Sequence, residues 1–454
     1  MWDRASHRLC GVCDLAGATM SLDPFDRRTF ALSALALPLL ARSVTAVAAP
    51  AEPVSILGFG ARPDGLTINT RAIQTAIDSL SARGGGTVLV PAGVFVSGAL
   101  FLKPGVNIHL AEGAVLRCST QMSNFPPRRT RIEGHFEERF TPALLNADGC
   151  DGLRITGRGV LDGAGRTVWD LFWKLRNAAP VPGEFPNIGL PRARLALIEN
   201  SKNVLVDGVT FKDSQFWNLH LYKCEHVLVR GARFEVPDDY AQAPSSDGID
   251  VDSCREVTVD GCYFSVTDDC IAAKGSKGPG ALEDRDSPPV EGLRVRNCHF
   301  RRGHHALACG SEATVVRDVI VENCRVTGRM VLARLKLRSD TPQRYEDIRF
   351  RNIRLDDRAG TVMAIEPWSQ YTDFKGMAPP KSSVRGLEFS GLTGRFGALG
   401  TVRPNPGQTE IRGLTLRNFD LQLADAQLRT TGVEDIVFDH VMINGKVRRS
   451  DFPA

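Results

Sequence analysis

A short hydrophobic pattern recurs along the chain and constrains the fold more than any other feature. It consists of an apolar residue, any residue, a second apolar residue, two further residues, and then a small or apolar residue. Copies recur at intervals of roughly 22 to 39 residues, at Val204–Val209, Leu228–Ala232, Val257–Cys262, Leu293–Cys298, Val319–Cys324, Ile348–Ile353, Leu387–Leu392, Leu414–Phe419 and Ile436–Val441. Period-two alternation makes each copy a short strand with one buried face. Short strands that recur in this way, and cannot bury that face alone, predict a solenoid.

The solenoid that best fits the pattern is a single-stranded right-handed parallel β-helix, an all-β fold. Equivalent side chains would stack between rungs about 4.8 Å apart. One inward column would then hold Val209, Ala232, Cys262, Cys298, Cys324, Ile353 and Leu392. A buried thiol packs as a small hydrophobe, although a disulfide between neighbouring rungs stays open. Nine of the 11 cysteines follow the N-terminal leader, and this odd number argues against a complete disulfide framework.

The open N-terminal end of a solenoid needs a cover, and a helix is expected there. The segment 69–80 places Ile73, Ile77 and Leu80 on one helical face, and three consecutive glycines follow it. No linker-like stretch follows this short cap. We therefore expect residues 52–454 to form one β-helix domain.

Composition excludes several classes of protein. Hydrophobic residues make up 43% of the 454 residues and charged residues 24%, which excludes a disordered chain and a protein with many membrane spans. The 56 basic and 52 acidic side chains leave a formal charge of only +4, and no basic stripe is interleaved with aromatic residues. We therefore expect no nucleic-acid partner.

Residues 1–48 have the pattern of an N-terminal extension and export signal. Arg27-Arg28 precede a short apolar run that ends at Leu40, and Ala46–Ala48 suit a signal peptidase. The run is shorter than the 18 or so residues that a bilayer span needs, so we expect no membrane anchor. The arginine pair indicates the twin-arginine pathway, with an ordinary Sec signal as the alternative. The expected location is periplasmic or extracellular.

Four polar clusters occur at repeat-sized intervals: Ser245-Ser246-Asp247-Gly248-Ile249-Asp250, Thr267-Asp268-Asp269-Cys270, Gly303-His304-His305 and Arg334-Leu335-Lys336. Asp268 and His304 each lie nine residues after the second apolar residue of their repeat, so we expect one to lie above the other on neighbouring rungs. Asp247 precedes Asp269 by 22 residues, about one coil. Arg334 follows His304 by 30 residues, about one coil plus a loop.

Carboxylates gathered on neighbouring rungs repel one another, so at least one should keep its proton at neutral pH. A carboxylic acid beside carboxylates suits glycosidic bond cleavage, because the acid protonates the leaving oxygen while another carboxylate activates water. Arg334 and Lys336 point to the same side of a strand and could bind an anionic sugar. Alone, each cluster could be a solvated turn, a calcium ligand or an exposed strand face, and Asp250 and Asp252 are expected at a turn or edge. All four clusters in register indicate a site.

At this point the sequence resembles glycoside hydrolase family 28, the polygalacturonase-like enzymes. The family carries Asn-Thr-Asp, Gly-Asp-Asp, Gly-His-Gly and Arg-Ile-Lys motifs, which the four clusters match in order. The resemblance covers nearly the whole chain after the leader and also includes residues 59–65, 84–93, 161–165 and 216–220. It implies an exported hydrolase of α-1,4-galacturonosyl, or pectic, linkages.

The resemblance also implies a role for each matched carboxylate. Asp269 would be the general acid, and Asp247 and Asp268 would position and deprotonate the attacking water. His304 would keep the acid correctly protonated. The family inverts anomeric configuration, so the same outcome is expected here.

Substrate binding is the role that the resemblance gives to Arg334 and Lys336, which would hold the sugar carboxylate at the cleavage subsite. It implies a pectic poly- or oligosaccharide substrate and no metal or other cofactor. We expect the protein to act as a monomer.

The chain departs from the family motifs at uncharged positions. Ser245 replaces the Asn, Thr267 and His305 replace glycines, and Leu335 replaces the Ile. The charged residues remain, so hydrolysis is the expected chemistry. The altered positions lie where the family shapes the sugar pocket, which leaves rhamnogalacturonan and unsaturated or short oligogalacturonides open as substrates.

Two readings from other classes remain. A calcium-dependent pectate lyase would use Asp247, Asp250, Asp268 and Asp269 as oxygen ligands. Metal dependence and an unsaturated product would distinguish it from a hydrolase. A non-catalytic carbohydrate-binding β-helix would present aromatic platforms without an acidic cluster in register.

Overall fold

The computed structural model describes residues 52–182 and 185–449. The predicted export signal lies outside these residues. Within them the chain forms a right-handed parallel β-helix, as the repeat predicted. None of the helices in the described residues is long and apolar enough to cross a membrane.

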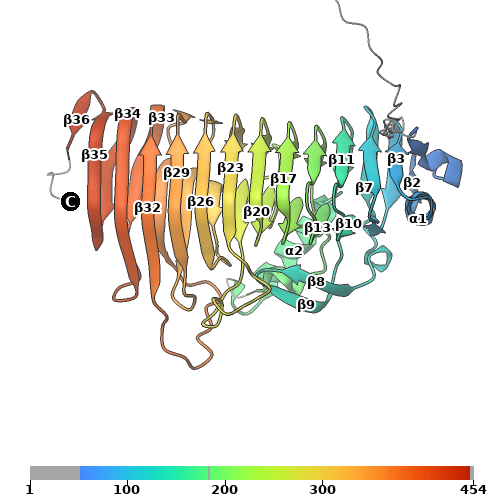
Figure 1. Ribbon diagram of the computed structural model, residues 1–454, viewed down its shortest axis with the longest axis horizontal. Coiled ribbons are helices and arrows are strands. Elements are labelled where there is room, and N and C mark those ends of the chain that lie inside the picture. The colour runs from blue at the N-terminus through green and yellow to red at the C-terminus, as the bar shows by residue number, and fades with distance from the viewer. Residues whose placement is uncertain (1–51, 183–184, 450–454) are drawn as a thin grey trace, which may run out of the picture. The chain divides into compact units, whose positions relative to one another are not determined.

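The first ladder of parallel strands contains the repeats seen in the sequence (Figure 1). Neighbouring strands are paired in register, with Val259 opposite Val295 as an example. In order, the ladder comprises β1 (Val54–Ser55), β3 (Gly86–Val90), β6 (Val106–Leu110), β11 (Arg154–Gly157), β14 (Leu205–Asp207), β17 (Glu225–Arg230), β20 (Arg255–Asp260), β23 (Val290–Arg296), β26 (Val315–Glu322), β29 (Arg344–Arg351), β32 (Ser382–Ser390), β34 (Thr409–Thr430) and β35 (Val433–Ile443).

A second ladder follows a tight turn after each of these strands. It comprises β2 (Asp64–Ile68), β4 (Gly93–Ser97), β7 (Ala114–Cys118), β12 (Val160–Asp162), β15 (Thr210–Lys212), β18 (Arg233–Glu235), β21 (Tyr263–Ser265), β24 (His299–Arg302), β27 (Arg325–Val326), β30 (Arg354–Asp356) and β33 (Thr393–Val402).

The third ladder carries the polar clusters. It comprises β5 (Leu100–Phe101), β10 (Leu145–Asp148), β13 (Ala196–Glu199), β16 (Leu219–Tyr222), β19 (Ile249–Asp252), β22 (Ile271–Lys274), β25 (His305–Cys309), β28 (Val331–Arg338) and β31 (Thr361–Trp368), and β33 continues it. A final strand, β36 (Lys446–Arg448), pairs antiparallel with β35.

Inward side chains of successive coils stack on one another and form one continuous core. The clearest stack is aromatic: Phe211, Phe234, Phe264 and Phe300 follow one another with ring centroids 4.9, 5.0 and 5.2 Å apart. The predicted inward column of cysteines is confirmed, because Cys262, Cys298 and Cys324 are all buried. Every cysteine in the described residues is free, so the alternative of a disulfide between neighbouring rungs is wrong for these residues.

The turn from the first ladder to the second explains the spacing of the repeat. The residue just before the last position of each repeat has a positive φ, between 52° and 78°. These residues are Gly208, Gly231, Gly261, Asn297, Asn323, Asn352, Gly391, Asn418 and His440. Glycine adopts this left-handed conformation at no steric cost, and asparagine tolerates it better than most residues. The turn therefore places the following small or apolar residue inward on every coil.

The predicted N-terminal cap is confirmed as α1 (Thr70–Ala82). It buries Ile73, Ala76, Ile77 and Leu80 against the first coils. The helix begins after Asn69, whose side chain bonds to the backbone of the preceding loop instead of capping the helix.

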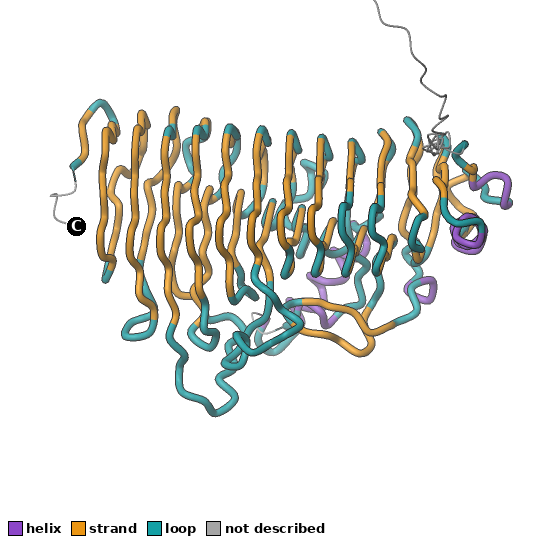
Figure 2. The backbone as a smooth tube through the Cα atoms, in the orientation of Figure 1, coloured by secondary structure: helices purple, strands orange, loops and turns teal. Residues whose placement is uncertain are grey.

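Several insertions flank the third ladder and were not foreseen from the sequence. They are α2 (Arg166–Ala178), the antiparallel hairpin of β8 (Arg128–Ile132) and β9 (His135–Phe140), and long loops after β22 and β31. Figure 2 shows that the long loops gather at the same side of the strands. These insertions cover the part of the third ladder that carries the acidic residues.

The positive-φ turn predicts the effect of substitution at Asn418, which is exposed and has a φ of 54°. Asn418→Val should lower the free energy of unfolding by about 1–2 kcal/mol, because an ordinary L-residue pays that cost in the left-handed region. Asn418→Gly, the matched control, should stay within about 0.5 kcal/mol of the parent chain. Urea denaturation of the three proteins measures both values, and equal losses for both variants would contradict the prediction.

Candidate active site

Asp247, Asp269 and His305 lie in one row on three neighbouring coils. The N–H of Gly248 donates to the carbonyl of Asp269 over 2.9 Å, and the N–H of Cys270 donates to the carbonyl of His305 over 2.8 Å. Asp247 directly precedes Gly248, and Asp269 directly precedes Cys270. The register of the coils therefore stacks the three side chains on one another, with Asp247 one coil from Asp269 as the sequence predicted.

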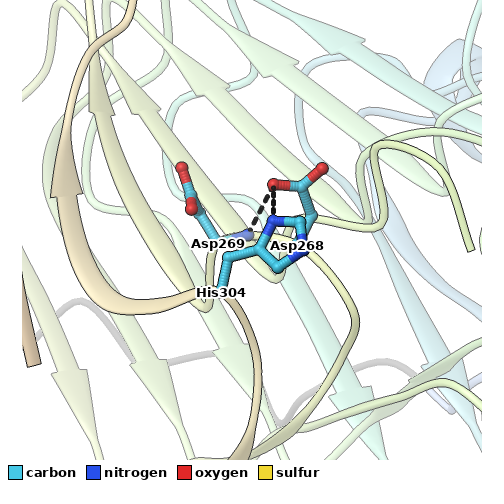
Figure 3. Close-up of side chains that lie close together, drawn as sticks. All are labelled: Asp268, Asp269 and His304. Carbon is cyan, nitrogen blue, oxygen red and sulfur yellow. Dashed lines mark hydrogen bonds and ion pairs between the residues drawn. The ribbon is translucent and has the colours of Figure 1, made fainter. Parts of the chain in front are cut away.

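Asp268 and His304 form a second pair one residue earlier in the same coils (Figure 3). The N–H of His304 donates to the carbonyl of Asp268 over 2.8 Å, and its Nδ1 lies 3.3 Å from Asp268 Oδ1. The predicted stacking of these residues on neighbouring rungs is confirmed. Both carboxylates reach one site because Asp268 and Asp269 lie in the bend between β21 and β22, outside the alternation of a strand.

Each oxygen of the Asp269 side chain has a partner that stabilises the ionised carboxylate. Its Oδ2 accepts a hydrogen bond from Lys336 Nζ at 3.0 Å, and its Oδ1 contacts His305 Nδ1. Burial alone would raise the pKa of Asp269, but Lys336 and His305 together lower it well below its ordinary value. Burial lowers the pKa of His305, so that this imidazole is neutral and donates its Nδ1–H. Asp269 is therefore ionised in this arrangement.

Asp247 has the opposite environment. Burial, and then the negative charges of Asp268 and Asp250, raise the pKa of Asp247 well above its ordinary value. The nearest cation, Lys274 Nζ, lies 3.9 Å from Asp247 Oδ2 and compensates only in part. This difference agrees with the expectation that one carboxyl of the cluster keeps its proton.

His304 and Asp268 share a proton at neutral pH. The hydrogen bond and negative charge of Asp268 raise the pKa of His304 to about 9. Burial would raise the pKa of Asp268, yet the hydrogen bond and charge of His304 lower it overall. The imidazolium and carboxylate form an ion pair whose Asp268 side chain is 30% exposed, whereas the side chain of Asp269 is 1% exposed.

These residues line one cavity of about 300 Å³. Its floor comes from the third ladder and the bends before it, and its walls come from the insertions. The walls include Phe172, Trp173 and Arg176 of α2, Glu133 of the β8–β9 turn, and Trp368, Gln370 and Tyr371 at the end of β31 and in the loop after it. A volume of this size lies at the small end of the range for binding sites in proteins.

Two walls of the cavity meet. The hydroxyl of Tyr371 donates to the carbonyl of Phe185 over 2.8 Å. Tyr371 lies in the loop after β31, and Phe185 lies in the segment after α2. The contact joins two insertions from distant coils beside the cavity.

Arg334 does not line the cavity, although the sequence predicted that it would bind substrate there together with Lys336. Its Nη1 donates to Glu366 Oε1 over 2.7 Å, and its guanidinium lies 5.6 Å from the centre of the Trp368 ring. In the backbone register Arg334 lies opposite Ala308. Lys336, in contrast, lines the cavity.

Asp250 and Asp252 are not turn or edge residues, and that expectation is wrong. Both lie in β19, with exposed fractions of 0% and 1%. They point away from the helical core, but the β8–β9 hairpin covers this face and Arg131 donates to Asp252 over 3.1 Å. Asp250 lies 3.7 Å from Lys274. The sequence showed the alternation of this strand but not the hairpin that buries its outer face.

Asp268, Asp269 and His304 offer ligand atoms within 4.8 Å of one another and could hold a metal ion. The charges already present fit a cation poorly. Lys336 Nζ contacts Asp269, and Lys274 Nζ lies within 3.9 Å of both Asp247 and Asp250. Calcium would need six to eight oxygen ligands, and the two ammonium groups compete for those of the calcium-dependent alternative.

Several lining residues were missed by the sequence analysis. His305 was noted only as a departure from a glycine, yet it contacts Asp269 directly. Lys274, the last residue of the strand that follows the Asp pair, was not considered, and Glu133 lies in a hairpin that was not foreseen. For Lys274 the signal was present, since a lysine in a buried strand calls for a carboxylate partner.

Comparison with known proteins gives the family. The model of glycosyl hydrolases family 28 matches residues 86–444. The chain belongs to this family. The family match favours a glycoside hydrolase over the lyase and over a non-catalytic β-helix.

Individual relatives are distant. A probable polygalacturonase of Vitis vinifera is 28% identical over 48% of this chain and 43% of its own length. An exo-poly-alpha-D-galacturonosidase of Dickeya chrysanthemi is 25% identical over 77% of this chain and 62% of its own length. The matches thus span less than two thirds of either relative. The crystal structure of a hyperthermoactive exopolygalacturonase from Thermotoga maritima shares the fold, with a TM-score of 0.71 and 23% identity over 88% of this chain and 93% of that chain.

The pair of Asp268 and His304 predicts an unusual titration. The imidazole of His304 should titrate near pH 9, because Asp268 raises its pKa to about 9 by stabilising the protonated ring. In Asp268→Asn the pKa should fall towards the ordinary value of about 6.5. NMR of protein labelled at histidine measures both, and the resonance is assigned by its loss in His304→Gln. Titration of His304 near pH 6.5 in the unaltered chain would contradict the proposed ion pair.

Proposed function

We propose that this protein hydrolyses α-1,4-galacturonosyl linkages of pectic chains with inversion of configuration. The observation that carries the proposal is the group of Asp247, Asp268 and Asp269 in one cavity, in which the pKa of Asp247 is raised and those of Asp268 and Asp269 are lowered. Neighbouring carboxyl groups whose environments separate their pKa values can divide acid and base roles between them. The names of the relatives supply the substrate class, because they are polygalacturonases and a galacturonosidase.

The proton donor in this proposal is Asp268, acting with His304. The family motif assigned this role to Asp269, but the charge of Lys336 and the hydrogen bond from His305 favour its ionised form. A donor must reach the leaving oxygen, and Asp268 is the most exposed of the three carboxylates. His304 supplies the shared proton, which passes through Asp268 to the glycosidic oxygen as that bond breaks.

Asp269 then accepts a proton from the attacking water, with Asp247 as a second hydrogen-bonding partner for that water. Both oxygens of Asp269 are engaged, one by His305 and the other by Lys336. A carboxylate held in this way can accept a proton from water more readily than it can form a covalent bond to the sugar. This supports direct attack by water and therefore inversion. Lys336 has three N–H donors, so it can also contact the substrate carboxylate.

The two aspartate roles predict different responses to the leaving group. Asp268→Asn and Asp269→Asn should each lower turnover of polygalacturonate by about 10²–10⁴. On a dinitrophenyl galacturonide, whose leaving group needs no proton, Asp268→Asn should stay within about tenfold of the parent enzyme while Asp269→Asn keeps its full defect. Initial rates on both substrates measure this difference.

The exposed Asp78→Asn on α1 provides the control and should match the parent enzyme. Recovery of Asp269→Asn instead of Asp268→Asn on the activated substrate would return the donor role to Asp269. No hydrolysis of any pectic substrate by the parent chain would reject the proposed function itself.

Cleavage from chain ends is the mode of action that we propose. The contact between Tyr371 and Phe185 joins two insertions beside the cavity. We expect this bridge to obstruct a polymer that would lie across the cavity. Two of the similar proteins are described as exo-acting, which supports the same mode.

Product analysis tests the mode of action. Polygalacturonate should release a single small product from the first minutes, with little loss of viscosity, because each cut removes only a terminal unit. Size-resolved chromatography and viscometry of the same digest measure this. An early ladder of oligomers with a rapid fall in viscosity would show that the cavity admits internal segments.

Location and assembly complete the proposal. A polymeric substrate lies outside the cytoplasm, which supports export through the signal with Arg27-Arg28, by the twin-arginine pathway. Residues 52–454 would act as one β-helix domain. We also propose that the protein acts as a monomer.

A further inference from the structure

Arg176 lies in the last turn of α2 and lines the wall of the cavity. Nothing in the four sequence motifs points to it, because α2 is an insertion between β12 and β13. Its guanidinium carbon lies 5.8 Å from the ring centre of Trp173 and 6.0 Å from that of Phe172. These rings keep the side chain against the cavity wall.

Arg176 differs from the other cations of the cavity in having no acidic partner among the residues that the structure describes. Lys336 is paired with Asp269, and His304 is paired with Asp268. Lys274 lies among three carboxylates within 3.9 Å. Across residues 52–182 and 185–449, no ion pair or hydrogen bond engages the guanidinium of Arg176.

The balance of charge makes this free cation important for an acidic sugar. Glu133 and Glu312 line the cavity together with the three aspartates. The lysines and His304 are already committed to these acids, and the neutral His305 adds no charge. Arg176 adds a cation beyond those that face these acids, and it can attract a carboxylate on the substrate.

We propose that Arg176 binds the carboxylate of a galacturonate unit and so determines the preference for acidic over neutral sugars. This inference rests on the proposed function. Guanidinium groups present parallel N–H donors that match a carboxylate, and such charge-assisted pairs are stronger and more directional than neutral hydrogen bonds. The assignment fills the place that the sequence gave to Arg334, which is bound to Glu366 outside the cavity.

The test compares Arg176→Gln with Arg176→Lys and with the matched control Lys174→Gln, which removes an exposed cation from the same helix outside the cavity lining. Arg176→Gln should raise KM for trigalacturonate by roughly ten- to hundredfold, the cost of a lost charge-assisted hydrogen bond, with kcat within about twofold. Arg176→Lys should recover part of the loss, because it keeps the charge but not the paired donors. Lys174→Gln should leave both constants unchanged.

Direct binding separates this inference from the proposed function. Calorimetry with galacturonate and with its neutral methyl ester needs no turnover. The parent chain should bind galacturonate more tightly than the ester, and Arg176→Gln should remove most of this difference. Equal binding of galacturonate by the parent and Arg176→Gln chains, or an equal loss in Lys174→Gln, would overturn the role of Arg176 even if pectic chains are hydrolysed. Loss of the acid preference in Arg176→Gln without hydrolysis by the parent chain would support the binding role and reject the proposed function alone.

Discussion

The hydrogen-bonded register between neighbouring coils is the constraint on which the rest of the structure depends. A slip of one residue would turn every side chain of a strand to the opposite face. Here the same pairing that places Val259 opposite Val295 in the core also places Asp268 against His304 on the outside. The apolar stacks and the left-handed turn on each coil hold this register. The catalytic groups are therefore positioned by residues that lie far from any substrate.

Much of the fold could be predicted from the sequence, because in a solenoid the spacing of residues along the chain determines which side chains lie next to one another. The inward cysteines, the cap helix and the stacking of Asp268 with His304 all follow from counting residues along the repeat. The insertions could not be predicted in this way, since α2 and the β8–β9 hairpin follow no repeat. Asp250 and Asp252 were expected at an edge because the covering hairpin was not foreseen. For Arg334 the sequence did not reveal the pairing with Glu366 on the next coil.

Buried charges are tolerated at this site because nearly every charged side chain lies beside one of opposite charge. An isolated carboxylate in such surroundings would be costly, and the usual outcome is a shifted pKa or a paired cation. Both outcomes are present on adjacent coils: Asp247 has its pKa raised, whereas Asp269 is paired with Lys336. The replacement of a family glycine by His305 adds a neutral donor to Asp269 without adding charge. The family motif considers residue types and not the neighbours around each residue. On that basis it assigns the donor role to Asp269.

The contact of Tyr371 with Phe185 also has a consequence for the order in which the molecule assembles. Solenoids fold by propagation from coil to coil, so contacts within a coil and with its neighbours form early. The two partners of this hydrogen bond are separated by 186 positions in the chain, and they meet only after all the coils between them have stacked. The carboxylate row, built from adjacent coils, is then complete before the Tyr371–Phe185 contact forms. Fraying of the later coils would accordingly break this contact first and leave the acidic cluster intact.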